Sequence, residues 1–378
     1  LAPHATLYPY HDAASALAGE RTASPWVASL NGDWQFTLLA NPNAVTPATL
    51  QSAQWHTVAV PGLWTMQGFE KPHYLNIKMP FPNTPPSVPD ANPVGVYHRQ
   101  MTIPAHWQNR RVILHFGGVE GMLCVYVDGQ AIGMGKDART PAEFDITRYV
   151  TPGQTHEVMA VVVRWSDATF IEDQDQWWHA GINREVLIYS TSNPFLRDLH
   201  VLAKPDSEYK GGTLTVTAST NNPGELRDDW QVSVQLYGPD GKPCFNEPLH
   251  QPSRWAPKDK SVVDGWGSRI AAYDQVELQA TLKRVECWNH EQPNLYTVLV
   301  TFHTPNGDEY YSTRVGFRDI TIANRELRIN GQAVLINGVN RHDHDDTQGR
   351  VISRELMRKD ILLMKQFNIN AVRCSHYP

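Results

Sequence analysis

Three stretches of this sequence gather residue types that can bind or react with a ligand. Residues 340–346 read NRHDHDD and place two histidines among carboxylates. Residues 370–378 read NAVRCSHYP, and residues 172–178 read EDQDQWW, where acids adjoin two tryptophans. Acids beside aromatic rings suit a polyhydroxylated ligand, because hydroxyl groups need hydrogen-bond partners and the rings offer an apolar surface.

Each of these stretches also has other interpretations. His342, His344 and a carboxylate could hold a metal ion, although their spacing matches no recognised zinc pattern. Cys374 and His376 could lie on one face of a strand, as a Cys/His hydrolase would require. Neighbouring strand residues point apart, so Ser375 and His376 are not expected to form a nucleophile–base pair. Solvated loops, core tryptophans or a structural arginine would explain the same residues without any ligand.

Charge and composition narrow the class of protein. The 378 residues carry a formal net charge of -6 and no basic stripe, so nucleic acid is not an expected partner. The longest apolar run, residues 158–163, is far shorter than the roughly 20 residues of a membrane span. The N-terminus lacks a signal-peptide pattern, and four cysteines form no CxxC pair. We therefore expect a cytoplasmic protein that does not enter a membrane.

The elements that must position these residues begin with two β modules. Short strands separated by turns indicate a jelly-roll β-sandwich, and they are expected at residues 34–39, 111–116, 122–127, 157–165 and 186–190. A second set of strands indicates an immunoglobulin-like sandwich, at residues 213–218, 231–236, 275–282 and 296–303. The proline-rich residues 79–93 are expected to form a loop, because proline cannot donate to a strand ladder.

After residue 318 the pattern changes. Residues 327–329 and 334–336 flank an Asn-Gly turn and predict a hairpin. A strand starting within residues 334–339 leads to a helix that Ser353 would cap, followed by a strand at 371–374. Strand, helix and strand predict a parallel pair with a right-handed crossover. Polar residues that follow such strands in a β/α barrel face the active site.

Taken together, these stretches resemble glycoside hydrolase family 2, and specifically the large bacterial β-galactosidases of the lac-operon type. The resemblance covers essentially the whole chain. The motifs that carry it include VYVDG at 125–129, RWSD at 164–167, GINREV at 181–186, the segment 337–344 and the specific run 370–378.

The resemblance implies a multidomain, mainly β fold. It implies a jelly-roll sugar-binding domain at 1–192, an immunoglobulin-like β-sandwich at 193–319 and the beginning of a (β/α)8 TIM barrel at 320–378. A whole barrel takes roughly 250 residues. The chain is therefore expected to hold a truncated barrel and to be inactive by itself.

The resemblance also implies an activity, which is the retaining hydrolysis of terminal β-D-galactosides such as lactose. Two glutamates perform this reaction, and they are expected beyond Pro378 together with the ligands of a magnesium ion (Mg²⁺). The full-length form is expected to be a homo-oligomer. Two alternatives stay open: another family 2 glycosidase, namely a β-glucuronidase or β-mannosidase, or a non-catalytic carbohydrate-binding fragment.

Five residues match positions with known roles in that family. Asp175 looks like the acid that meets both the substrate and a sodium ion (Na⁺). Asn76 looks like a first-domain loop residue that reaches the sugar. His342 and His376 look like the histidines that bind galactose hydroxyls, and Arg373 looks like an arginine that supports the site.

The sequence also departs from the close relatives at four positions. Asn337 and Asp343 replace the commoner arginine and glutamate, and Trp178 with His179 replaces a less aromatic pair. We expect these changes to bear on aglycone preference or local stability.

Overall fold

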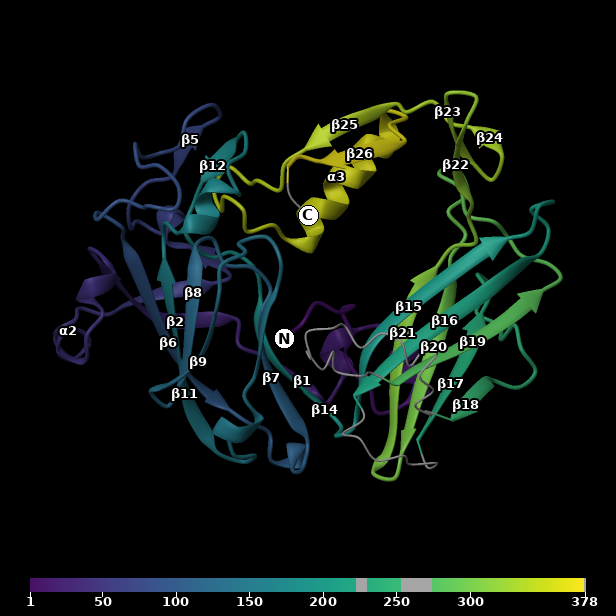
Figure 1. The fold of residues 1–378 in the computed structure, drawn as a ribbon, viewed down its shortest axis with the longest axis horizontal. Coiled ribbons are helices and arrows are strands. Elements are labelled where there is room, and N and C mark those ends of the chain that lie inside the picture. The colour runs from purple at the N-terminus through teal and green to yellow at the C-terminus, as the bar shows by residue number, and fades with distance from the viewer. Residues whose placement is uncertain (222–229, 253–273, 377–378) are drawn as a thin grey trace, which may run out of the picture. The chain divides into compact units, whose positions relative to one another are not determined.

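The chain forms two compact units (Figure 1). The structure is a computed structural model, and it describes residues 1–221, 230–252 and 274–376. The first unit holds Leu1, Ala28–Tyr189 and Ile336–Pro378, and the second holds Ala2–Val27 and Ser190–Leu335. These units do not coincide with the predicted domains 1–192, 193–319 and 320–378. The boundaries of those domains stay a prediction. Tyr377 and Pro378, part of the predicted 370–378 site segment, lie outside the described residues.

Two sheets make the jelly-roll sandwich of the first unit (Figure 1). The strands of the larger sheet are β2 (Gly32–Leu39), β3 (His56–Val60), β6 (Val94–Thr102), β8 (Met122–Val127), β9 (Gln130–Gly135) and β11 (Thr155–Val163). The strands of the smaller sheet are β1 (Val27–Ser29), β7 (Arg111–Phe116), β10 (Ala142–Asp145) and β14 (Val186–Thr191). Their orders are β3-β2-β6-β11-β8-β9 and β1-β14-β7-β10, and the larger sheet is antiparallel throughout.

Alternating side chains build the core of this sandwich. On β2, Trp34 and Phe36 are buried, while the alternate residues Asp33 and Gln35 face solvent, as the two-residue period of a strand requires. The ring of Tyr97 on β6 lies 4.7 Å from the Phe36 ring and 6.5 Å from the Trp34 ring, centroid to centroid. Trp34 is therefore a core residue of this sandwich.

Shorter elements flank the strands of the sandwich. They are α2 (Pro47–Ser52), β4 (Gly62–Leu63), β5 (His73–Leu75), β12 (Gln176–Trp178) and β13 (Gly181–Ile182). Two small antiparallel pairs form among them, β12 with β5 and β13 with β4. Between β5 and β6 the described chain contains no strand, which confirms the predicted proline-rich loop at 79–93.

The second unit is an immunoglobulin-like sandwich (Figure 1). One sheet has the order β15-β16-β19, from β15 (Phe195–Pro205), β16 (Gly212–Asn221) and β19 (Asp274–Leu282). The other has the order β18-β17-β20-β21, from β17 (Gln231–Tyr237), β18 (Leu249–Pro252), β20 (Tyr296–Thr304) and β21 (Gly307–Val315). Between them lies an apolar cluster that includes Val216, Leu278, Val234, Val300 and Tyr311.

The N-terminal segment packs on this second sandwich. Helix α1 (Ala13–Ala18) is capped by the side chain of Asp12. The backbone of Tyr10 exchanges two hydrogen bonds with Tyr310 of β21, at 2.8 and 3.1 Å. Tyr10 is also buried beside Leu299. These contacts explain why residues 2–27 belong to the second unit.

A small three-stranded sheet follows the second sandwich, in the order β22-β23-β24. Its strands are β22 (Ile320–Ala323), β23 (Glu326–Ile329) and β24 (Gln332–Ala333). The predicted hairpin exists, but its second strand was wrongly placed at 334–336. Asn330 and Gly331 both have positive φ, at 48° and 73°, and so form a two-residue turn that starts the return strand at once.

The last elements belong to the first unit and confirm the predicted strand–helix–strand order. They are β25 (Gly338–Arg341), α3 (Arg354–Gln366) and β26 (Ala371–Cys374), with β25 and β26 paired in parallel. The Ser353 side chain accepts a hydrogen bond from the backbone N–H of Leu356 at 3.1 Å, as the predicted cap requires. No helix in the described part of the chain has the length and apolar character to cross a membrane.

Gly95, in the middle of β6, allows a prediction about the sandwich core. A Cβ atom there would lie 2.5 Å from the Trp64 ring and 2.7 Å from the Phe36 ring. Because these rings are packed in the core, Gly95→Ala should lower the free energy of unfolding by about 1–3 kcal/mol. Urea denaturation followed by tryptophan fluorescence measures this. Gly135→Ala on the edge strand β9 is the control, since its Cβ would meet only the Ala142 Cβ, at 3.2 Å. Equal losses in the two variants would contradict this view of the core.

Candidate functional site

A pocket of about 300 Å³ opens on the first unit, between the sandwich and the segment that starts at Ile336. Its lining residues are polar or aromatic: Tyr74, Asp175, Gln176, Trp177, His342, His344 and Arg350. They come from three places in the sequence, namely β5, the region of β12, and the loop after β25. Pockets of this size hold small ligands and use a few polar groups to orient them.

Strand pairing creates the first wall. Strand β5 pairs antiparallel with β12 and sets Tyr74 opposite Trp177. The Tyr74 hydroxyl donates to Asp175 Oδ1 at 2.5 Å. This hydrogen bond raises the pKa of Tyr74, because it favours the protonated phenol. Asp175 is thereby held at the pocket with a defined orientation.

Aromatic rings form a continuous surface along this wall. The ring of Trp177 lies 5.4 Å from that of Tyr74 and 6.2 Å from that of His344, and the latter pair is stacked at 25°. Trp177 keeps 41% of its surface exposed and Tyr74 keeps 49%. Exposed rings next to a carboxylate can cover the apolar face of a sugar ring while the carboxylate accepts from its hydroxyls.

Two imidazoles supply the second wall. Burial lowers the pKa of His342, and the nearby His376 and Arg350 add to this effect. The negative charge of Asp175 opposes it. Burial, followed by Arg350 and His342, lowers the pKa of His344 in the same way. Both rings are therefore neutral at pH 7. A neutral imidazole carries one donor and one acceptor, which matches a sugar hydroxyl that is both.

The structure brings only part of the predicted site together. Asp175 and His342 line the pocket. The ring of His376 lies 5.5 Å from that of His342 without lining the pocket, and Arg373 donates to His376 Nδ1 at 3.2 Å. Asn76 is exposed on the loop that follows β5 and does not line the pocket. The substrate-binding role of all five residues stays a prediction.

The alternatives for these residues can also be compared with the structure. The described residues contain no group of three or more His, Cys, Asp or Glu side chains that could hold a metal ion. A hard cation such as sodium takes several oxygen ligands, and the Asp175 carboxylate would suit it as one of them. The thiol of Cys374 is exposed, while the His376 ring contacts Arg373, His342 and Ser375. A Cys/His nucleophile pair therefore finds no support.

One expectation about this region was wrong. The Ser375 hydroxyl lies 3.2 Å from His376 Nδ1 and 3.1 Å from Nε2, so these side chains do not point apart. The physical reason is that β26 ends at Cys374, and the alternation of a strand does not continue into Ser375.

The four departures from the family pattern lie in supporting positions. Asn337 binds the backbone carbonyl of Asn368 at 2.9 Å, and Asp343 pairs with Arg341. Trp178 is buried with Trp165, at 5.6 Å between ring centroids. None of the four, His179 included, lines the pocket, and their expected effect on aglycone preference or local stability stays a prediction.

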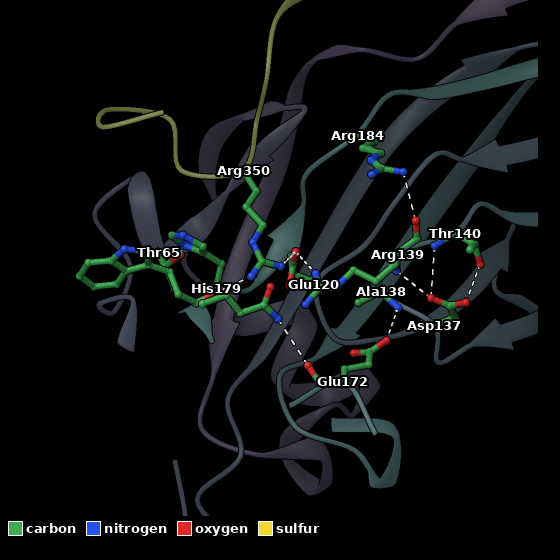
Figure 2. A network of polar contacts seen from close by, with 12 residues as sticks. Thr65, Glu120, Asp137, Ala138, Arg139, Thr140, Glu172, His179, Arg184 and Arg350 are labelled. Carbon is green, nitrogen blue, oxygen red and sulfur yellow. Dashed lines mark hydrogen bonds and ion pairs between the residues drawn. The ribbon is translucent and has the colours of Figure 1, made fainter. Parts of the chain in front are cut away.

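Behind the pocket lies a buried polar network that sequence reasoning missed (Figure 2). Glu120 Oε1 accepts hydrogen bonds from Arg139 and, at 2.6 Å, from Nη1 of Arg350. Nη2 of Arg350 donates to the backbone carbonyl of Trp177 at 2.8 Å. His179 is buried next to this network, with Nδ1 3.1 Å from the Thr65 hydroxyl. Neither Glu120 nor Arg350 was among the predicted site residues.

The two sandwiches, the parallel β/α start and the polar, aromatic pocket define a multidomain, mainly β protein with one candidate ligand site among its described residues. Three family models match most of the chain. They are described as "Glycosyl hydrolases family 2, sugar binding domain" at residues 27–192, "Glycosyl hydrolases family 2" at 195–318 and "Glycosyl hydrolases family 2, TIM barrel domain" at 320–378. The chain belongs to glycosyl hydrolase family 2.

The chain is also similar to individual curated proteins. A β-galactosidase of Priestia megaterium (strain DSM 319 / IMG 1521) is 37% identical over 391 residues, covering 99% of this chain and 36% of its own length. A β-galactosidase of Vibrio cholerae serotype O1 is 36% identical over 387 residues, covering 100% of this chain and 36% of its own length. The chain thus spans about a third of the length of these relatives.

Solved structures share the fold at lower identity. The β-glucuronidase of Bacteroides uniformis has a TM-score of 0.71 at 20% identity, over 93% of this chain and 39% of that one. A family 2 member from Bacteroides cellulosilyticus DSM 14838 has a TM-score of 0.71 at 17% identity, over 93% and 45%. These structures support the mainly β, multidomain architecture.

His179 makes a pH-dependent prediction. Burial lowers the pKa of His179 to about 3. The negative charge of Glu120 opposes this shift, and the positive charge of Arg350 adds to it. Between about pH 3 and 6.5 the unfolded chain binds a proton at this position that the folded chain does not, so stability falls as pH falls. The expected slope is about 1.4 kcal/mol per pH unit within that window.

Urea denaturation at pH 7 and pH 5 tests this prediction. The loss of unfolding free energy on acidification should be smaller in His179→Gln than in wild type, by on the order of 1–2 kcal/mol. His250→Gln, which changes an exposed histidine of β18, is the control and should behave as wild type. An unchanged pH dependence in His179→Gln would contradict the assignment.

Proposed function

We propose that the protein carrying this chain is a β-galactosidase that hydrolyses terminal β-D-galactosides, such as lactose, with retention of configuration. The observation that carries the proposal is the 36–37% identity to curated β-galactosidases over 99–100% of the chain. The pocket supports it, since Asp175 and His342 meet there beside an aromatic wall. Because the chain spans about a third of those relatives, the activity is proposed for the whole protein.

The pocket would serve binding and not bond cleavage. Retaining hydrolysis needs an acid and a nucleophile whose carboxyl groups are about 5–5.5 Å apart. Among the described residues that line the pocket, Asp175 is the one carboxylate. We therefore place the two catalytic glutamates in later barrel strands, beyond Pro378. Hydrogen bonds from neutral His342 would lower the barrier if they strengthen as the sugar ring flattens.

A β-glucuronidase and a β-mannosidase are the alternative activities within the family. Among the described lining residues, Asp175 is the one carboxylate and Arg350 adds a positive charge, so the pocket charges do not separate a neutral sugar from a uronic acid. Substrate comparison separates these activities from the proposed one.

The proposal also covers the ions, the location and the assembly of the whole protein. Asp175 would give one oxygen ligand to a sodium ion, which when bound adds positive charge beside the sugar hydroxyls. The magnesium ligands would lie with the catalytic glutamates. The four cysteines are all unpaired, which fits a cytoplasmic location. The homo-oligomer stays part of this proposal.

Hydrolysis of chromogenic glycosides tests the proposal. We expect the whole protein to cleave p-nitrophenyl β-D-galactoside in preference to the matching β-D-glucuronide and β-D-mannoside. Preference for either of the other two would overturn the assignment of substrate class.

Asp175→Asn tests the role of the pocket carboxylate. Loss of a charged acceptor for sugar hydroxyls should lower kcat/KM for the galactoside by about 10–100-fold, from the 1.5–3 kcal/mol of a charged hydrogen bond. Asp173→Asn is the matched control, because Asp173 is exposed two residues away and does not line the pocket. A similar loss in both variants would show that the effect is not specific to the pocket.

A further inference from the structure

One guanidinium group connects the two walls of the pocket. Arg350 is 5% exposed and lines the pocket at the end of the loop that carries His344. It donates to Glu120 Oε1 at 2.6 Å through Nη1 and to the carbonyl of Trp177 at 2.8 Å through Nη2. Two bonds from one planar group fix its position in two directions, which a single charge contact does not.

Glu120 is an immobile partner for this group. Its side chain is 5% exposed, and its backbone exchanges hydrogen bonds with Gly181 at 2.8 and 3.2 Å. Burial alone would raise the pKa of Glu120, but Arg139 and Arg350 outweigh burial and lower it. The carboxylate is thus charged, and two guanidinium groups compensate for its removal from water. Figure 2 shows these side chains meeting from separate parts of the first unit.

The loop that Arg350 anchors is closed by its own hydrogen bonds. Asp345 and Gly349 exchange two backbone hydrogen bonds, at 2.7 and 2.9 Å. The Asp345 carboxylate also accepts from the backbone N–H groups of Thr347 and Gln348, each at 2.9 Å. A movement of Arg350 would therefore shift the loop as one body.

Gly349 brings this loop into direct contact with the sandwich. Its φ is +64°, and a Cβ there would lie 2.9 Å from both the His179 ring and the Leu63 side chain. Glycine is required for the turn and for the close approach. The loop is consequently docked at Gly349 and Arg350, a few residues after His342 and His344.

We propose that Arg350, held by Glu120, is a positioning residue for substrate binding. It sets the distance between the imidazoles of the loop and the carboxylate that precedes Trp177. The inference rests on the proposed function of the pocket. It gives Arg350 a role that does not require contact with the sugar. A small displacement of either wall would separate the groups that must hold one ligand together.

Arg350→Met is the informative variant, because Arg139 remains as a partner for Glu120 and no buried charge is left alone. We expect this change to raise KM for p-nitrophenyl β-D-galactoside about tenfold, equivalent to about 1.4 kcal/mol, with a smaller change in kcat. Arg350→Lys should lie between wild type and Arg350→Met, since an ammonium keeps the charge but cannot reproduce both bonds of the planar group.

Arg111→Met is the matched control. It removes an arginine that binds Asp145 through two nitrogens, at 2.9 and 3.1 Å, in the same sandwich but outside the pocket lining. The control should leave KM within about twofold of wild type, because the lost contact lies away from the pocket. Equal KM values in Arg350→Met and the control would overturn the proposal.

Hydrogen exchange of the whole protein gives a second readout that does not depend on turnover. In Arg350→Met, amides of residues 172–178 and 342–349 should exchange faster together, while those of β2 and β6 keep their wild-type rates. Unchanged exchange in both segments would overturn the positioning role. If wild type shows no galactoside hydrolysis, the proposed function fails, and the exchange data still decide whether Arg350 joins the two walls.

Discussion

The charge of Glu120 is the constraint on which the pocket depends. A carboxylate removed from water is destabilising unless opposite charges and hydrogen bonds compensate it. Here the compensation comes from Arg139 within the sandwich and from Arg350 on a segment 230 residues later in the chain. The segment after Ile336 therefore adds a second cation to a carboxylate that Arg139 already pairs, and this contact fixes where the segment docks on the sandwich.

The chemistry of the pocket follows from this connection. The same guanidinium that neutralises Glu120 holds the Trp177 carbonyl, so the aromatic wall and the histidine loop share one anchor. Its positive charge also helps to keep His342 and His344 neutral, which suits them to uncharged hydroxyl groups. Stability and recognition thus use the same contacts, and the β-sandwich takes a direct part in forming the site.

Local patterns predicted the elements better than the site. Strands β7, β8 and β26 coincide with their predicted bounds, and Ser353 caps α3, because alternation and capping are short-range properties. Asp175 and His342 were found through a family resemblance. Arg350 was missed since nothing local distinguishes a buried arginine from an exposed one. The Ser375–His376 contact was missed because it depends on where a strand stops.

The central claim is that one sugar binds between Asp175 and the loop that carries His342. A crystal structure of the whole protein with a non-hydrolysable thiogalactoside tests it most directly. The account predicts a galactose ring in this pocket, with hydroxyls at hydrogen-bond distance from the Asp175 carboxylate and the His342 imidazole, and Arg350 still bound to Glu120. A ligand bound elsewhere, with this pocket left to solvent, would contradict it.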